Sequence, residues 1–282
     1  PEDLEEYRWF SSMFKAMIKK EINNPLQIDG LLMIPCAGMG KRFSDFGYKS
    51  PKPLVKVSGK PMFIQAIKDL PIMEKTKLIV RKDMDMSNEL CAEAKKYLSR
   101  IEIQLIESLT NGQAATCLLG LKKNDLEKPL IISACDNGLI YKKREFEELI
   151  GDKSIDIIVF GSRGYPGAIK KPNMYGWIEE YKGLVKRIHV KTKFRKPEQD
   201  PIVTGTFYFK QAKIYKEIAE DLIKNNQKVN NEFYIDSAIN NALESGFKVA
   251  YFEVDYYLCW GTPNDLKTYK YWQNCFNEWT SH

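Results

Sequence analysis

Apolar residues along the chain alternate between short dense runs and longer segments in which they recur every three or four positions. The short runs are typical of buried strands, and the longer segments have the period of an amphipathic helix. We expect strands at residues 30–35, 77–80, 101–106, 129–135 and 155–160. Helices fit between them at residues 61–70, 86–100, 113–123 and 143–150. This alternation predicts an α/β domain with a Rossmann-like, mostly parallel central sheet flanked by helices.

The pattern changes in the second half of the chain. Residues 175–181 and 184–190 flank the turn Lys182-Gly183, so they predict an antiparallel β-hairpin inserted into the sheet. A helix is expected to begin at Pro263, with Thr262 as its N-cap. The remaining expected elements are a strand at 202–209, helices at 211–225 and 232–245, and a strand at 248–256. We therefore divide the chain into an N-terminal helical segment at 1–28, a main domain at 29–262 and a C-terminal helix at 263–282.

The first and last predicted helices resemble each other. Residues 1–14 and 263–276 share Pro, Asp, Leu, Tyr and Phe at one fixed offset of 262 residues. An offset of domain size is typical of tandem copies. We therefore interpret residues 1–28 as the end of a preceding, related domain, which makes a neighbouring homologous domain a partner in a longer chain. The alternative is two unrelated amphipathic helices with the same Pro-x-Asp-Leu start.

Composition narrows the class of protein. The 282 residues are 44% hydrophobic and 28% charged, which is globular and sufficient for one large core. A net charge of +6, spread along the chain, suits a small anionic substrate and argues against a nucleic-acid partner. We find no membrane-spanning run, no signal peptide and no zinc spacing among the six cysteines and two histidines. A cytoplasmic protein without a membrane partner is expected.

A basic, glycine-rich loop follows the first predicted strand directly, with the sequence Pro35-Cys-Ala-Gly-Met-Gly-Lys-Arg-Phe43. Gly38 and Gly40 can let backbone N–H groups converge on phosphate oxygens, because glycine lacks the Cβ that would block their approach. Positive charge comes from Lys41, Arg42 and Lys52. The loop matches neither GxGxxG nor GxxxxGK[ST], so neither of those phosphate-binding motifs applies. By itself, a glycine pair with two basic residues also fits a simple turn.

Three motifs in order identify a family resemblance. The loop Gly38–Arg42 is followed by Pro51-Lys-Pro-Leu54 and then by Gly59-Lys-Pro-Met62. This order resembles the sugar-phosphate nucleotidyltransferase family, or pyrophosphorylases, and the resemblance extends to Glu232–Asp236 and Trp260–Leu266. It implies the nucleotide-diphospho-sugar transferase fold, with the main domain as the catalytic domain. It also implies transfer of a nucleoside monophosphate from a nucleoside triphosphate to a sugar 1-phosphate or small phosphorylated alcohol, with release of pyrophosphate.

The resemblance also implies which residues bind the substrates. The residues it assigns to the nucleotide are Ala37, Gly38, Gly40, Lys41, Arg42, Lys52, Gly112 and Gln113. Gly112 and Gln113 would read the base, unless they only form a helix-capping loop, and the pair favours CTP or UTP. The residues assigned to the acceptor, with its hairpin, are Tyr175, Gly176, Lys191, Thr204 and Gly205. Val190 replaces the glutamate that usually precedes the lysine, so Lys186, Arg187 and Lys193 remain alternatives to Lys191, and 204–205 could be an ordinary core strand.

A magnesium site is implied at Asp136, which follows an apolar strand where family members have their metal-binding aspartate. Ligands bind at the carboxyl ends of strands in open α/β sheets, and Mg²⁺ prefers oxygen ligands. The family's usual second metal-binding aspartate is Cys259 here, so a second ligand would come from Asp255 or Asp236, or be missing. The catalytic residues implied are therefore Arg42, Lys52, Asp136 and Lys191.

Two other functions fit parts of the sequence. A nucleotide-sugar-dependent glycosyltransferase would also have an acidic metal site, but it predicts an Asp-x-Asp motif, whereas this chain reads Ala134-Cys-Asp-Asn-Gly138. A non-catalytic nucleotide-binding member of the same fold, with a regulatory or scaffolding role, is the second alternative. Cys259 and the repeated helix keep that alternative open.

Overall fold

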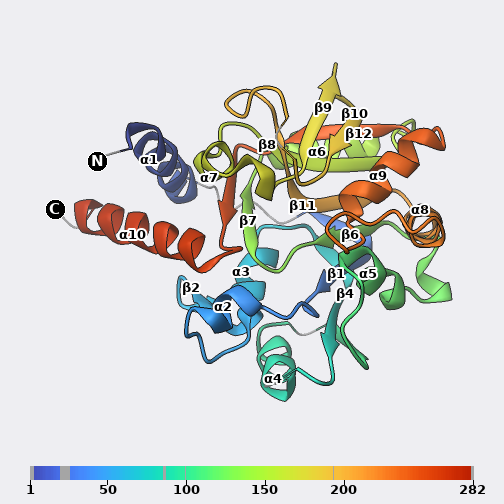
Figure 1. The fold of residues 1–282 in the computed structure, drawn as a ribbon, viewed down its shortest axis with the longest axis horizontal. Coiled ribbons are helices and arrows are strands. Elements are labelled where there is room, and N and C mark those ends of the chain that lie inside the picture. Colours follow the sequence, from blue (N-terminus) through green and yellow to red (C-terminus); the bar gives the residue numbers. More distant parts are fainter. Residues whose placement is uncertain (1–2, 20–25, 85–86, 99, 193, 281–282) are drawn as a thin grey trace.

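The computed structural model describes residues 3–19, 26–84, 87–98, 100–192 and 194–280. A nine-stranded mixed sheet forms its centre, in the order β5-β4-β1-β6-β11-β8-β12-β10-β9 (Figure 1). Its strands are β1 (Gln27–Pro35), β4 (Ile72–Arg81), β5 (Ile101–Ile106), β6 (Leu130–Ser133), β8 (Ile157–Ser162), β9 (Trp177–Tyr181), β10 (Leu184–His189), β11 (Ile202–Phe209) and β12 (Val249–Glu253). Two small pairs lie outside it, β2 (Lys56–Val57) with β3 (Lys60–Pro61) and β7 (Asn137–Ile140) with β13 (Tyr256–Cys259).

The direction of one strand determines which residues meet at the sheet edge. Strands β5, β4, β1 and β6 run parallel, as do β8 and β12, which confirms the expected α/β fold. Strand β11 runs antiparallel between β6 and β8. Its first residues therefore lie beside the carboxyl end of β6, and the Ala134 amide donates to the Gly205 carbonyl at 3.0 Å. Strands β9 and β10 form the hairpin, which pairs with β12 and so extends the same sheet.

Helices cover both faces of the sheet. They are α2 (Lys41–Asp45), α3 (Met62–Ile67), α4 (Ser87–Tyr97), α5 (Gln113–Gly120), α6 (Lys143–Gly151), α7 (Pro166–Lys170), α8 (Ala212–Lys224) and α9 (Ile235–Glu244). In β1, Leu31 and Met33 pack with α5, α8 and α9, whereas Leu32 and Ile34 pack with α3, α4 and α6. Successive side chains of a strand point to opposite faces, so a continuous apolar run is what a doubly covered strand requires.

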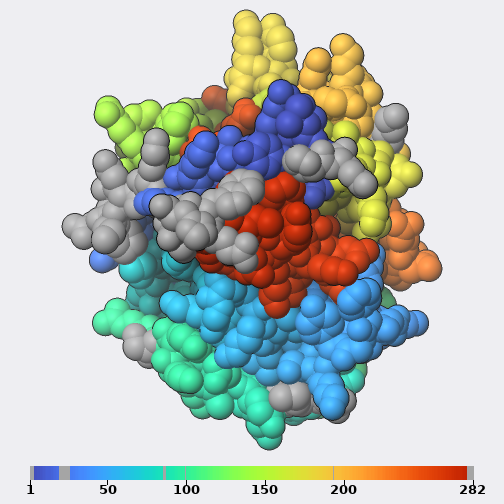
Figure 2. Space-filling view, turned by 90° about the vertical axis from the view of Figure 1, so that its left-hand side faces the viewer, coloured from blue at the N-terminus to red at the C-terminus, as the bar shows by residue number. Residues whose placement is uncertain are grey.

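The two remaining helices, α1 (Leu4–Lys19) and α10 (Pro263–Thr280), lie side by side beyond the end of the sheet (Figures 1 and 2). The predicted cap of α10 is confirmed, because the Thr262 hydroxyl accepts from the Asp265 amide at 3.2 Å and the Asp265 carboxylate accepts from the Thr262 amide at 3.0 Å. Within the described part of the chain, no helix is long and apolar enough to cross a membrane.

Several element boundaries differ from the predictions; β4, for example, begins at Ile72 rather than at residue 77. The strand expected at 248–256 is two strands, because β12 ends at Glu253 and the chain then turns to pair β13 with β7. The helix expected at 232–245 begins only at Ile235, since the Phe233 amide donates to the Asn111 carbonyl at 2.7 Å. The helix expected at 113–123 ends at Gly120.

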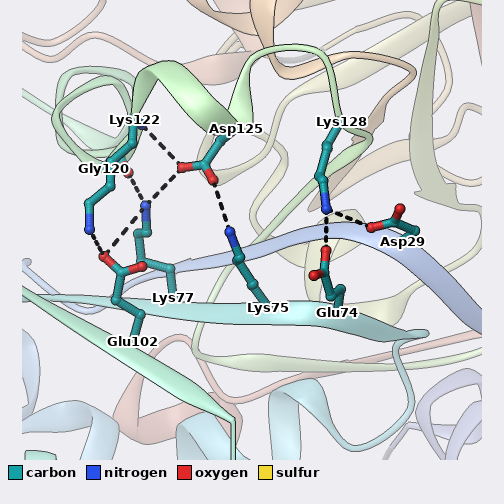
Figure 3. A network of polar contacts seen from close by, with 9 residues as sticks. All are labelled: Asp29, Glu74, Lys75, Lys77, Glu102, Gly120, Lys122, Asp125 and Lys128. Carbon is teal, nitrogen blue, oxygen red and sulfur yellow. Dashed lines mark hydrogen bonds and ion pairs between the residues drawn. The ribbon is translucent and has the colours of Figure 1, made fainter.

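A buried ion-pair network fixes the end of α5 to the sheet (Figure 3). Lys77 of β4 is fully buried and donates to the Gly120 carbonyl at 2.6 Å and to the Asp125 carboxylate at 3.2 Å. Asp125 also accepts from the Lys122 amide at 3.1 Å. A buried ammonium needs such partners, because transfer from water is costly for an unpaired charge. The network therefore fixes the C-terminal end of α5. The N-terminal end of this helix begins at Gln113, directly after Gly112.

Removing the buried ammonium tests this anchoring role. Lys77→Met leaves Asp125 buried without its closest cation, so we expect the free energy of unfolding to fall by about 3 kcal/mol. Lys75→Met is the matched control, because Lys75 is 46% exposed at 3.9 Å from the same carboxylate, and it should cost less than about 1 kcal/mol. Urea denaturation measures both, and equal losses would contradict the role of Lys77.

Candidate active site

A single cleft of about 570 Å³ at the carboxyl ends of β1 and β6 is lined by nearly all the site residues expected from the sequence. These are Ala37, Gly38, Gly40, Lys41, Arg42, Lys52, Gly112, Gln113, Asp136, Tyr175, Gly176, Lys191, Thr204 and Gly205. Asp255 is not brought together with them, because it lies on the exposed bend between β12 and β13. Of the two proposed second ligands, only Asp236 faces the cleft.

The glycine-rich loop connects β1 to α2 at one end of the cleft. Gly40 has a φ of +62°, a conformation that glycine adopts without strain, and its carbonyl accepts from the Phe43 amide at 2.8 Å. A Cβ on Gly40 would lie 3.3 Å from the Lys52 Cβ, whereas the space in front of Gly38 is open. The loop therefore packs closely on the Lys52 segment and leaves Lys41 and Arg42 exposed at the rim.

Lys52 and Asp136 form an ion pair at the centre of the cleft. The Lys52 Nζ donates to the Asp136 Oδ2 at 2.5 Å and to the Gly261 carbonyl at 2.9 Å. Desolvation alone would lower the pKa of Lys52, but the attraction of Asp136 and other neighbours outweighs it, so the pKa is raised. Lys52 therefore carries its positive charge at neutral pH. The Asp136 side chain keeps 25% of its surface exposed.

The position of the family's second metal ligand holds a neutral thiol. Cys259 is opposite Asn137 in the β13–β7 pair, and its Sγ lies 3.7 Å from the Asp265 Oδ2. Burial, followed by the charges of Asp265 and Asp136, raises the pKa of Cys259 to about 12. A protonated thiol is a poor ligand for Mg²⁺, which prefers oxygen. Among the described residues, no group of three or more His, Cys, Asp or Glu side chains could hold a metal ion.

The loop at Gly112 and Gln113 is fixed to the segment before α9 by backbone contacts with Phe233. Gly112 has a φ of +114°, and a Cβ on it would come within 2.6 Å of the Phe233 backbone. The Ala114 amide donates to the Phe233 carbonyl at 3.0 Å. Within the described chain the amide group of Gln113 has no hydrogen-bond partner, and Gln113 lines the cleft. The Glu232–Asp236 motif thus holds the loop in place, a role its sequence alone did not indicate.

The segments that flank the hairpin, together with the start of α9, line another part of the cleft. The Lys191 Nζ donates to the Met174 carbonyl at 2.5 Å and lies 5.4 Å from the centre of the Tyr234 ring. Asp236 sits against Gly176, where a Cβ would collide with its carboxylate. Desolvation raises the pKa of Asp236 to about 6, and the nearby Lys191 ammonium opposes this rise.

The alternatives to Lys191 are placed elsewhere. Lys186 and Arg187 are exposed on β10 and do not line the cleft, and Lys193 lies outside the described residues. The Thr204 hydroxyl donates to the Phe160 carbonyl at 3.0 Å, so its side chain is committed to the core.

Among the cleft residues that the sequence did not lead us to assign, Asn137 lies next to the central ion pair. Asn137 is buried beside Asp136, and its side-chain amide donates to the Thr204 carbonyl. Its Oδ1 has no hydrogen-bond partner among the described residues. Its position directly after the predicted metal ligand was the one signal that could have identified it.

Solved structures share this fold. The nucleoside-diphosphate-sugar pyrophosphorylase from Vibrio cholerae RC9 is 19% identical, with a TM-score of 0.67 over 84% of this chain and 98% of its own. The inositol-1-phosphate CTP transferase from T. maritima is 16% identical, with a TM-score of 0.65 over 87% and 96%. A UDP-glucose pyrophosphorylase complexed with UDP-glucose is 16% identical, with a TM-score of 0.64 over 89% and 99%. Curated protein sequences include no significant match.

The family comparison covers the whole cleft. The model of the Nucleotidyl transferase family matches residues 31–274, a range from within β1 into α10. It includes the glycine-rich loop, the Lys52–Asp136 pair and the hairpin, so the resemblance inferred from the motifs is confirmed. The chain belongs to the nucleotidyl transferase family.

Proposed function

We propose that this nucleotidyltransferase joins a nucleoside monophosphate, taken from CTP or UTP, to a sugar 1-phosphate or small phosphorylated alcohol. The observation that carries the proposal is the distribution of charge in one cleft. Arg42, Lys41 and Lys191 line the same cleft as the Lys52–Asp136 pair. Two anions can therefore be held close to one carboxylate.

The reaction needs little from the protein beyond positioning and charge. An oxygen of the acceptor phosphate attacks the α-phosphorus, the bond between the α-phosphorus and the bridging oxygen breaks, and pyrophosphate leaves with that electron pair. A phosphate monoester is already ionised near neutral pH, so no general base is required. We assign the leaving pyrophosphate to Arg42 and Lys41, the α-phosphate to Lys52 and the acceptor phosphate to Lys191. Their charges offset the repulsion between the substrates.

Asp136 is the residue that would hold Mg²⁺. Magnesium usually binds proteins through one or two carboxylates and completes its shell with water and substrate phosphates. A single, partly exposed carboxylate facing the cleft fits that requirement. When bound, the ion would neutralise charge on the transferring phosphoryl group. Cys259, as a neutral thiol, is not proposed as a second ligand.

The proposed preference for a pyrimidine base rests on the loop at Gly112 and Gln113. Gln113 has an unpaired amide that can donate to a carbonyl and accept from an amine, and Gly112 brings the backbone close to it. The similar structures named for CTP and for UDP-glucose use pyrimidine nucleotides, which supports this choice. At the acceptor end, the Asp236 carboxylate and the Asn137 Oδ1 are oxygen atoms that would accept hydrogen bonds from acceptor hydroxyls.

A pyrophosphate-release assay tests the proposed substrates. Each nucleoside triphosphate is paired in turn with sugar 1-phosphates, phosphorylated polyols and phosphorylated amino alcohols, in the presence of Mg²⁺. We expect release only with CTP or UTP, and only when an acceptor phosphate is present. Release with ATP or GTP alone would contradict the assignment of the base, and nucleotide binding without release in any pairing would favour the non-catalytic alternative.

Comparing the same substitution at Asp136 and at Asp255 distinguishes a specific role of Asp136 from a general effect of losing one negative charge. Asp136→Asn removes the carboxylate facing the cleft, and we expect turnover to fall by about 10²- to 10³-fold because the transferring charge loses its stabilisation. Asp255→Asn removes an acid outside the cleft and should keep the parent rate. Steady-state rates of pyrophosphate release measure both. The proposal is wrong if the two variants are equally active.

The role of Lys191 predicts a selective effect on the acceptor. Lys191→Met removes a charge-assisted contact of about 1.5–3 kcal/mol, so the KM for the acceptor should rise roughly ten- to hundredfold. The KM for the nucleotide should change little. Lys186→Met removes an exposed lysine of β10 that does not line the cleft, so it serves as the control and should leave both constants unchanged. A rise confined to the nucleotide KM would reverse the proposed orientation of the substrates.

A further inference from the structure

Helices α1 and α10 pack as an antiparallel pair (Figure 1). Their ring contacts are nearly two-fold symmetric. The Phe14 and Tyr269 rings are 5.6 Å apart, and the offset of 262 residues maps this contact onto Tyr7 and Phe276, which are 6.1 Å apart. Two further contacts, Phe10–Trp272 at 6.1 Å and Phe14–Phe276 at 5.6 Å, map onto themselves.

A surface that contacts its own equivalent in this way is self-complementary, as in a two-fold dimer. The symmetry is approximate, since the Tyr7–Trp272 contact at 5.7 Å has no counterpart among the described ring pairs. The two helices nevertheless face each other through equivalent residues, so α1 resembles the α10 of a second copy of the domain.

The contacts of α1 with the rest of the domain lie on one flank of the helix. The Trp9 ring packs edge-on against Tyr165 at 5.8 Å and Tyr256 at 5.3 Å. On the same side, Lys170 of α7 forms an ion pair with Glu6 at 2.5 Å. The counterpart of Trp9 in α10 is Tyr271, which is 60% exposed. Helix α10 therefore carries an aromatic residue at the equivalent place with no domain beneath it.

The contacts of α10 with the domain lie on the opposite flank. Leu266 is 0% exposed, whereas its counterpart in α1, Leu4, is 51% exposed. Leu4 and Trp9 are five residues apart, which places them about 140° apart around the helix axis. Each helix thus uses one flank for its own domain and its middle for the partner helix. The remaining flank of each helix faces the domain to which the partner helix belongs. The part of the chain that the structure describes contains only one such domain for the two helices.

We propose that α1 is the last helix of a second copy of this domain, which precedes it in the chain, and that this copy docks on the surface marked by Leu4 and Tyr271. The body of that copy covers Leu4 as Leu266 is covered here. Its counterparts of Tyr165 and Tyr256 receive Tyr271 as they receive Trp9 here. The inference does not depend on the substrates of the cleft.

The geometry also fixes the number of copies. The middle of α10, which carries Trp272 and Phe276, is already covered by α1 and can meet one helix only. Two domains and two helices therefore close the arrangement, and a third copy would find no free helix face. The result is a two-domain pseudo-dimer in one chain.

An extended chain tests the proposal directly. Residues 26–262 are joined in front of residue 1 of the full 282-residue chain, so that α1 becomes the last helix of the added copy. We expect a compact particle with approximate two-fold symmetry in small-angle scattering. Hydrogen exchange of the first turns of α1 and of the turn around Tyr271 should slow at least about tenfold relative to the 282-residue chain.

Single substitutions distinguish docking from mere tethering. Leu4→Ser and Tyr271→Ser should each restore fast exchange in the extended chain while leaving the unfolding midpoint of the 282-residue chain unchanged, because both side chains are exposed there. Tyr181→Ser is the matched control, since Tyr181 is 61% exposed on the hairpin, and it should change neither chain. An added copy that stays unfolded, or that folds without slowing exchange at these two flanks, overturns the proposal.

Discussion

The ion pair between Lys52 and Asp136 joins parts of the chain that are far apart in sequence. Asp136 extends from the end of a central strand, Lys52 follows the glycine-rich loop, and the Gly261 carbonyl that Lys52 also contacts precedes the last helix. Desolvation alone would lower the pKa of Lys52, but the attraction of Asp136 outweighs it and keeps this partly buried ammonium charged. In the reaction that we propose, a nucleotide would meet the Lys52–Asp136 pair already in position, so little reorganisation would be needed when negative charge moves from the α-phosphate to the leaving group.

The remaining parts of the cleft supply what that pair lacks. A phosphate acceptor brings its own nucleophile, so the protein must mainly hold two anions near each other. The glycine-rich loop offers backbone amides and Arg42, and the segment after the hairpin offers Lys191. Asp236, whose pKa is raised to about 6 by desolvation, lies near Lys191, where we propose that the acceptor binds. The neutral thiol of Cys259 leaves Asp136 as the only metal ligand that we propose.

Local sequence signals predicted the parallel half of the sheet and the phosphate loop, because apolar runs and glycine motifs act over a few residues. These local signals did not predict features that depend on pairing between segments far apart in the sequence. The chain turns after Glu253 because β13 finds its partner in β7, and this turn carries Asp255 away from the cleft. Asn137 enters the site through a hydrogen bond to Thr204, 67 residues away, and no local pattern reveals such a contact.

The central claim is that an acceptor phosphate oxygen attacks the α-phosphorus in the cleft around Lys52 and Asp136. An acceptor whose phosphate carries ¹⁸O, incubated with the preferred triphosphate and Mg²⁺, tests it most directly. Mass spectrometry of the products then locates the label. The account predicts ¹⁸O in the diphosphate product, including its bridging oxygen, and none in the released pyrophosphate. Free nucleoside monophosphate without label, together with unchanged acceptor, would show hydrolysis instead and would contradict it.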